Sequence, residues 1–158
     1  MSVSWDRAHR RYELVNAVLG DVAWTGTPEI SESRRAEIDR EYGEFGEFLA
    51  DVQRRWYRTF DARLDAVLED ADSDGDALAG ATAVLWRQVA VDLWPTCVLL
   101  NAHAGHASIA PIEAHHAERL FAVTGFDHRL YRVDSPQRTV RRRVLPMCRL
   151  SRWRTASA

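Results

Sequence analysis

The sequence contains no lysine, and all 21 of its basic residues are arginine. We attribute this absence to the base composition of the genome rather than to the chemistry of the protein. Long apolar runs are also absent. The most apolar stretch, residues 89–100, is interrupted by Asp92 and Pro95 and falls short of the roughly 20 residues that a membrane-spanning helix needs. The first residues form no hydrophobic signal-peptide core. We therefore expect a cytoplasmic protein with no membrane association.

The chain also lacks the motifs of several enzyme classes. It contains no P-loop, no Gly-x-Gly-x-x-Gly fingerprint, no Gly-x-Ser-x-Gly elbow and no cysteine–histidine pair at a useful spacing. These absences argue against a nucleotide-using enzyme and against a serine hydrolase. The two cysteines, Cys97 and Cys148, belong to no Cys-x-x-Cys motif. They indicate reduced thiols, with a single disulfide as the alternative.

What is present is a chain of 158 residues, a length that suits one domain with a real core. Its hydrophobic fraction of 46% and charged fraction of 28% are those of a globular protein. The net charge of −2 hides a separation of sign. Residues 128–158 contain nine arginines and one acid, whereas residues 1–127 contain 12 arginines and 22 acids. We therefore divide the chain into a helical domain, residues 1–127, and an arginine-rich extension, residues 128–158.

Apolar residues recur at helical spacing through most of residues 1–127, and no strand-like alternation appears there. Pro95 lies inside one expected helix, so that helix either kinks or gives way to a new one capped by Asp92. The expected helices cover residues 3–23, a stretch from a cap at Ser31 or Ser33 to Glu69 with a bend near Gly43 or Gly46, residues 77–103, and residues 111–125. The predicted fold is an all-α antiparallel bundle of about four helices with a basic C-terminal extension.

Histidines gather in the stretch "NAHAGHASIAPIEAHH", residues 101–116. Glu113 and His116 form a Glu-x-x-His pair, the spacing with which helical di-iron bundles supply one carboxylate and one imidazole. His103 or His106 can come close to His116 only if the two flanking helices fold back on each other. Asp92 is a further candidate ligand, because an unpaired carboxylate in an apolar stretch is costly. We expect Asp92 to be buried or half-buried and paired with an arginine, a histidine or free helix amides.

Residues 113–121, "EAHHAERLF", also resemble the paired histidines and glutamate of hemerythrin-like metal-binding bundles. This chain departs from that pattern, since Glu118 follows His116 by two positions and no second His-x-x-x-Glu appears upstream. The alternative for the whole corner is that the histidines cap free carbonyls at helix ends or lie at the surface, and we prefer this alternative.

The acidic stretch at residues 70–76 resembles the first half of an EF-hand loop. Calcium would be bound by side chains or carbonyls of Asp70, Asp72, Asp74 and Asp76. The second half departs from the motif, because Ala81 occupies the position of the bidentate glutamate. The alternative is an ordinary polar linker, since Asp, Ser and Gly are common in such segments.

The extension interleaves arginine with aromatic residues, a pattern that suits phosphates, bases and carboxylates. The extension either folds back on the acidic domain or docks a partner, and we favour these two over nucleic acid because the domain would repel DNA. The residues predicted to bind a partner are Arg138, Arg141, Arg142, Arg143, Arg149, Arg152, Trp153 and Arg154.

Two functions follow from these observations. The leading hypothesis is a small cytosolic binding or regulatory module without chemistry of its own, which acts through its charge-polarised surface. Its extension would dock an acidic protein partner or nucleic acid, and a homo-oligomer is left open. The alternative is a metal-dependent helical-bundle enzyme or metal carrier, with iron, manganese or zinc held by the candidate ligands His103, His106, Glu113, His116 and Asp92.

Overall fold

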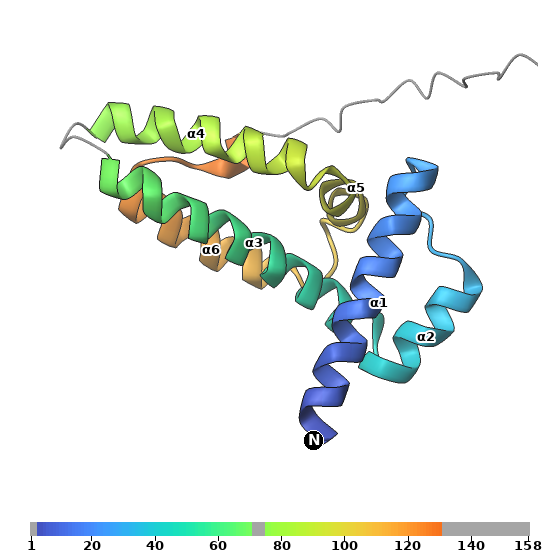
Figure 1. Ribbon diagram of the computed structural model, residues 1–158. Coiled ribbons are helices and arrows are strands. Elements are labelled where there is room, and N and C mark those ends of the chain that lie inside the picture. The colour runs from blue at the N-terminus through green and yellow to red at the C-terminus, as the bar shows by residue number, and fades with distance from the viewer. Residues whose placement is uncertain (1–2, 71–74, 131–158) are drawn as a thin grey trace, which may run out of the picture.

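The computed structural model describes residues 3–70 and 75–130, and every regular element in these two ranges is helical (Figure 1). The predicted all-α class is therefore confirmed over the described residues. About four helices were expected and six are found there, because two of the expected helices are each broken in two. The helices are α1 (Val3–Thr25), α2 (Glu32–Tyr42), α3 (Phe45–Asp70), α4 (Gly75–Asp92), α5 (Trp94–Ala102) and α6 (Ala110–Thr124), followed by the 3-10 turn η1 (His128–Leu130).

The break between α2 and α3 lies at Gly43, inside the region where a bend was predicted. Gly43 has a φ of +84°, a conformation that residues with a Cβ rarely adopt. Its amide donates to the Asp39 carbonyl and so closes the last turn of α2. Because the chain turns here, α2 packs against both α1 and α3 instead of extending α3.

The break between α4 and α5 lies at Leu93. Pro95 occupies the first turn of α5, where the missing amide hydrogen of proline is not needed. A new helix was one of the two expected outcomes, although Leu93 and not Asp92 holds the N-cap position. The two helices meet at an angle of 92°. Within the described ranges no single helix is long and apolar enough to cross a membrane, and only this bent pair reaches that length and apolarity together.

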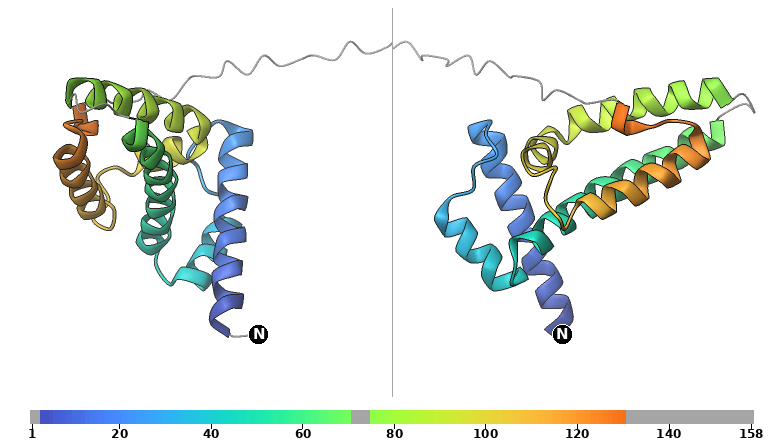
Figure 2. Two further views of the ribbon diagram at one scale, coloured as in Figure 1. Left: turned by 60° about the vertical axis from the view of Figure 1, so that its left-hand side comes forward. Right: turned by 180° about the vertical axis from the view of Figure 1, so that it is seen from behind.

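This bend decides the direction of the last long helix. After α5, the loop of residues 103–109 brings the chain back to the beginning of α3, where Phe45 contacts His106. Farther along, Leu68 of α3 lies across a hollow from Val123 of α6. Helices α3 and α6 therefore run side by side in the same direction, while α4 runs against both (Figures 1 and 2). The simple antiparallel bundle that was predicted is corrected accordingly.

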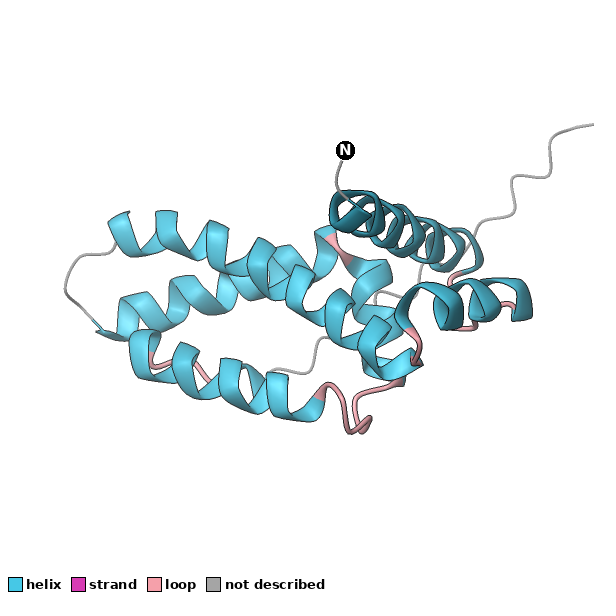
Figure 3. Cartoon of the chain, turned by 90° about the horizontal axis from the view of Figure 1, so that it is seen from below, coloured by secondary structure: helices cyan, strands magenta, loops and turns pink. Residues whose placement is uncertain are grey.

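Two hydrophobic cores hold the described residues together. Helices α3, α4 and α6 lie side by side at one end of the molecule, and α1 and α2 lie at the other (Figure 3). The N-terminal core consists of Leu14, Val15, Val18, Ile38, Tyr42, Phe48, Leu49, Val52, Leu99 and Ile109. The aromatic core consists of Trp56, Tyr57, Phe60, Leu64, Ala83, Leu85, Trp86, Val89, Leu120 and Phe126. Leu100 packs against both cores.

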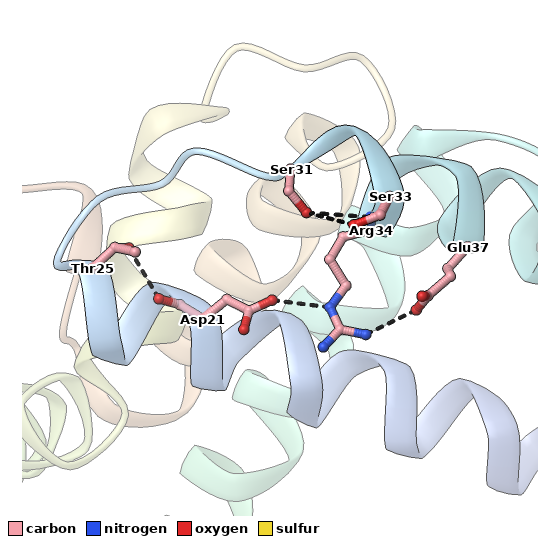
Figure 4. A network of polar contacts seen from close by, with 6 residues as sticks. All are labelled: Asp21, Thr25, Ser31, Ser33, Arg34 and Glu37. Atoms are coloured by element: carbon pink, nitrogen blue, oxygen red, sulfur yellow. Dashed lines mark hydrogen bonds and ion pairs between the residues drawn. The ribbon is translucent and has the colours of Figure 1, made fainter.

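A polar network joins α1 to α2 at the surface (Figure 4). The Ser31 hydroxyl accepts from the Arg34 amide at 3.4 Å, which confirms Ser31 as the N-cap of α2. The Arg34 guanidinium donates to Asp21 of α1 and to Glu37 of α2, both at 2.9 Å. These carboxylates raise the pKa of Arg34 above its ordinary value through hydrogen bonds, Asp21 contributing most. The network adds polar contacts between α1 and α2 at the surface, beside the apolar contacts of Leu14, Val15 and Val18 with Ile38 and Tyr42.

Candidate functional site: a central pocket and an arginine groove

His103 and His106, in the loop after α5, pack against Phe45 in the first turn of α3. The His103 Nδ1–H donates to the Leu99 carbonyl at 2.9 Å, so this ring caps a carbonyl at the end of α5. His106 Nδ1 accepts from the Ser108 amide at 3.2 Å. Both rings lie edge-on to the Phe45 ring, with centroids at 5.2 Å and 6.4 Å. The interpretation of these histidines as capping residues is therefore supported for His103.

His116 occupies a different place, deep between α3 and α6. It is buried, its Nε2–H donates to the Asp61 carboxylate at 2.9 Å, and its ring stacks on Tyr57 with centroids 3.7 Å apart. Burial lowers the pKa of His116, and the hydrogen bond to Asp61 opposes this effect. Phe45 and Tyr57 are 12 residues apart on α3, which corresponds to about 18 Å along the helix axis.

The predicted metal ligands are therefore not brought together. Over residues 3–70 and 75–130, no group of three or more His, Cys, Asp or Glu side chains is placed to hold a metal ion. His103 and His106 contact the start of α3, whereas His116 contacts its middle. Glu113 is half-buried and lines a pocket between α3, α4, α5 and α6. The metal-dependent alternative receives no support from this arrangement.

Asp92 was expected to be buried or half-buried, and this prediction is wrong. Its side chain is 53% exposed and accepts from the Arg63 guanidinium, at 2.6 Å. The arginine partner was among those predicted. The exposure follows from the helix break, because Leu93, four residues after the buried Val89, takes the next inward position. Asp92 takes no part in the histidine corner.

Two sets of predicted residues lie wholly or partly outside the described ranges. Asp70 ends α3 and Asp76 is the second residue of α4, but Asp72 and Asp74 fall in residues 71–74, which the structure does not describe. The calcium site therefore stays a prediction. The extension is described only as far as Leu130, so the eight arginine and tryptophan positions predicted to bind a partner lie outside the described residues.

A central pocket of about 100 Å³ lies between α3, α4, α5 and α6. Aromatic residues form much of its wall, and polar groups from four elements reach it. The residues that define it are Gln53, Trp56, Tyr57, Trp86, Cys97, Asn101, Glu113 and His128. This pocket was not predicted, and its one visible signal in the sequence is Gln53, a polar residue among the apolar positions Val52 and Trp56 of α3.

Burial dominates the electrostatics of the central pocket. It lowers the pKa of His128 to about 4, and the nearby His116 adds to the shift. It raises the pKa of Tyr57, and the negative charges of Glu113 and Asp61 add to that rise. Burial also raises the pKa of Cys97 to about 11, opposed by the nearby Trp56 indole N–H. At neutral pH the pocket therefore presents a neutral imidazole, a phenol and a thiol.

Several polar atoms around this pocket have no hydrogen-bond partner among the described residues. They are Gln53 Oε1, Trp56 Nε1 and His128 Nε2, and a fourth such atom, His116 Nδ1, lies outside the pocket lining. The Trp56 N–H approaches the Cys97 sulfur without the geometry of a hydrogen bond. Buried polar groups in folded proteins are nearly always paired with protein or water. Three residues with such atoms line one cavity, which marks it as a place for an additional molecule.

The neutral His128 imposes a pH dependence on stability. Because its pKa falls from the ordinary 6.5 to about 4 on folding, the unfolded chain binds more protons between these values. Unfolding is then favoured as the pH falls through this range. The free energy of unfolding at about pH 5.5 should be lower than at neutral pH by about 1 kcal/mol. In His128→Phe, which keeps a ring stacked on Trp86, the loss measured by chemical denaturation should be smaller by this amount. If the original protein and His128→Phe lose the same free energy of unfolding between neutral pH and pH 5.5, a lowered pKa of His128 is contradicted.

A second feature is open to solvent, on the face formed by α1 and α3. Two adjoining hollows of about 560 and 500 Å³ share Ala8 and Arg55, and we call them together the arginine groove. The first hollow is lined by apolar residues that include Val15, Leu19, Val52, Trp56 and Leu93. The basic residues of the whole groove are Arg7, Arg11, Arg54, Arg55 and Arg58, and the acids in its lining are Glu47 and Asp51.

Two of the groove arginines have close partners, and three are exposed without an ion pair among the described residues. Arg55 pairs with Asp51 at 2.9 Å, and Arg11 donates to the Glu41 carbonyl while lying over the Tyr42 ring. Arg7, Arg54 and Arg58 are exposed and form no ion pair within the part of the chain that the structure describes. The groove thus combines an apolar floor with free positive charge at its rim.

Comparison of the chain with protein-family models, with curated proteins and with solved structures finds no match. Among the described residues, the central pocket has unpaired hydrogen-bonding atoms on its lining residues, and the arginine groove has arginines without an ion pair.

Proposed function

We propose that the protein is a binding module whose arginine groove receives an acidic amphipathic segment of a partner protein. The observation that carries the proposal is the union of an apolar floor with the unpaired arginines Arg7, Arg54 and Arg58. An amphipathic helix lays its apolar face into such a groove, and its anchors follow the spacing of successive turns. Acidic side chains flanking that face would meet the arginines at the rim.

The charge of the described residues favours an acidic protein segment over nucleic acid as the partner. The described residues contain 13 arginines and 20 acids, so a long polyanion would be repelled outside the groove. An apolar floor also contributes nothing to binding a phosphate backbone. A short acidic segment gains from the floor and from the local positive charge. The arginine-rich extension, residues 128–158, would add attraction for the same partner.

The test uses a fluorescently labelled helical peptide with leucine at helical spacing and glutamate elsewhere. Binding is measured by fluorescence anisotropy with the full chain. We expect saturable binding that weakens with added salt, because the rim charges are screened. The double variant Arg54→Glu with Arg58→Glu should lose about tenfold or more in affinity, which corresponds to about 1.4 kcal/mol. Arg87→Glu, at an exposed site on α4 away from the groove, is the matched control and should keep the affinity.

Three outcomes would contradict the proposal. The first is unchanged affinity in the double variant, which would place binding outside the groove. The second is equal affinity for a peptide with lysine in place of glutamate. The third is tighter binding of a single-stranded oligonucleotide than of the acidic peptide. Circular dichroism of each variant separates a loss of binding from a loss of folding.

A further inference from the structure

The central pocket carries an inference that does not rest on the proposed function, although Trp56 lines both the pocket and the arginine groove. Gln53 Oε1, Trp56 Nε1 and His128 Nε2 are buried, unpaired and on residues that line one cavity. Each of these three residues is about 95% buried, since each side chain is 5% exposed. A buried polar atom that has given up water without gaining a partner lowers stability. A molecule in the pocket that pairs these atoms would remove this cost.

The hydrogen-bonding roles of these atoms can be assigned. The Trp56 indole nitrogen is a donor only, and Gln53 Oε1 is an acceptor, since the Gln53 amide nitrogen donates to the Tyr57 hydroxyl at 3.2 Å. Gln53 and Trp56 are three residues apart on α3 and so lie on the same face of the helix. One unpaired donor and one unpaired acceptor therefore lie on pocket-lining residues that share one face of α3.

We propose that the central pocket binds a small, flat, uncharged molecule that has a hydrogen-bond donor and an acceptor on neighbouring atoms, such as a primary amide or an azole. Its acceptor takes the Trp56 N–H, and its donor gives to Gln53 Oε1. The neutral imidazole of His128 offers a third contact. The volume of about 100 Å³ suits a ligand of a few non-hydrogen atoms.

The walls of the pocket select the shape of the ligand. Trp56 and Trp86 meet edge to face with ring centroids 4.4 Å apart, and Tyr57 lies edge-on to Trp56 at 5.4 Å. A flat ligand packs against such aromatic surfaces with little loss of conformational freedom. A branched or flexible ligand of equal volume would leave part of the wall uncovered.

The charges around the pocket select a neutral ligand. Glu113 lines the pocket, and Asp61 is one helical turn after Tyr57. Both carboxylates raise the pKa of the Tyr57 phenol, so the local potential opposes an anion. A cation would have to surrender its hydration in a site that already keeps His128 neutral, and it would face the Trp56 N–H donor. An uncharged ligand meets neither cost.

The experiment titrates the full, isotopically labelled chain with pyrazole and with acetamide, and it follows the tryptophan indole N–H resonances by NMR. The Trp56 resonance is assigned by its absence in Trp56→Phe. We expect this resonance to shift in a saturable manner with both probes, with a dissociation constant on the order of 1 mM, as suits ligands of this size. Thiophene, a flat ring without an N–H donor, should bind about tenfold more weakly than pyrazole.

A matched pair of variants locates the site. Gln53→Leu removes the acceptor and keeps a side chain of similar length, so the affinity for pyrazole should fall by about tenfold while the thermal midpoint is held or raised. Gln88→Leu makes the same change at an exposed position of α4 and should leave the affinity unchanged.

The proposal is overturned if neither probe shifts the Trp56 resonance at saturating concentration, since the pocket then holds only water. Tighter binding of ethylammonium or acetate than of pyrazole would overturn the assignment of an uncharged ligand. Retention of full affinity in the folded Gln53→Leu variant would place the probe elsewhere. None of these results bears on the acidic peptide, because the groove and the pocket are tested by different ligands and different variants.

Discussion

Replacing Phe60 by alanine is expected to lower the free energy of unfolding by about 3 to 5 kcal/mol. Phe60 is fully buried at the centre of the aromatic core, where its ring lies 5.8 Å from Trp56, 5.2 Å from Trp86 and 6.0 Å from His116. Its loss leaves a cavity between three helices, because these rigid rings cannot move far enough to fill it. Chemical denaturation followed by circular dichroism measures the effect.

Phe121 provides the matched control. It is 55% exposed on α6, so Phe121→Ala should change the stability by no more than about 0.5 kcal/mol. Should Phe60→Ala fail to fold, Phe60→Leu retains most of the volume and should lose about 1.5 kcal/mol or less. Equal stabilities for the Phe60→Ala and Phe121→Ala proteins would mean that the aromatic core is not packed as described.

Gly46→Ala should destabilise the protein by about 1 to 3 kcal/mol, because it overfills a tight contact. Gly46 is buried in the first turn of α3 and faces the loop before α6. A Cβ at this position would collide with the Ser108 hydroxyl and would lie 2.8 Å from the His106 ring. Either the loop must move away or α3 must shift along the N-terminal core. The melting midpoint and chemical denaturation both report the loss.

The same substitution at Gly80 has the opposite expected sign. Gly80 is exposed in α4 and has open space where a Cβ would lie, so Gly80→Ala should raise the stability by about 0.5 to 1 kcal/mol. Adding Ser108→Gly to Gly46→Ala should recover part of the loss, since it removes the colliding hydroxyl. If Gly46→Ala alone loses the expected stability and Ser108→Gly restores none of it, the destabilisation comes from the contact with His106 instead.

The helices were predictable wherever the sequence carries its own start and stop signals. Ser31, Pro95 and Pro111 mark the first turns of α2, α5 and α6, and Gly43 and Gly125 close the helices before them. Local signals of this kind act over a few residues and survive in any tertiary context. The direction of α6 is different in kind, because it depends on a 92° bend whose size no local signal specifies.

The sites were harder to predict, for a related reason. His103 and His116 are close in sequence, but the loop between them sends one to the start of α3 and the other to its middle. Gln53 and Trp56 are neighbours on α3, but His128 is 72 residues beyond Trp56 and joins them only because α3 and η1 line the same cavity. Spacing within one helix predicts neighbours on that helix, and it says nothing about which residues another helix will bring.

The division into two hydrophobic cores determines what optical spectroscopy of this protein reports. Both Trp56 and Trp86 belong to the aromatic core, whereas the aromatic side chains buried in the N-terminal core are Tyr42 and Phe48. Trp5 and Trp24 of α1 are 56% and 89% exposed, so their surroundings change less on unfolding. The change in indole emission during denaturation therefore comes mainly from Trp56 and Trp86, at the α3–α4–α6 end of the molecule. Far-ultraviolet dichroism weighs all helices by length. Coincident midpoints from the two signals would show that contacts such as those of Leu100 couple both ends into one cooperative unit.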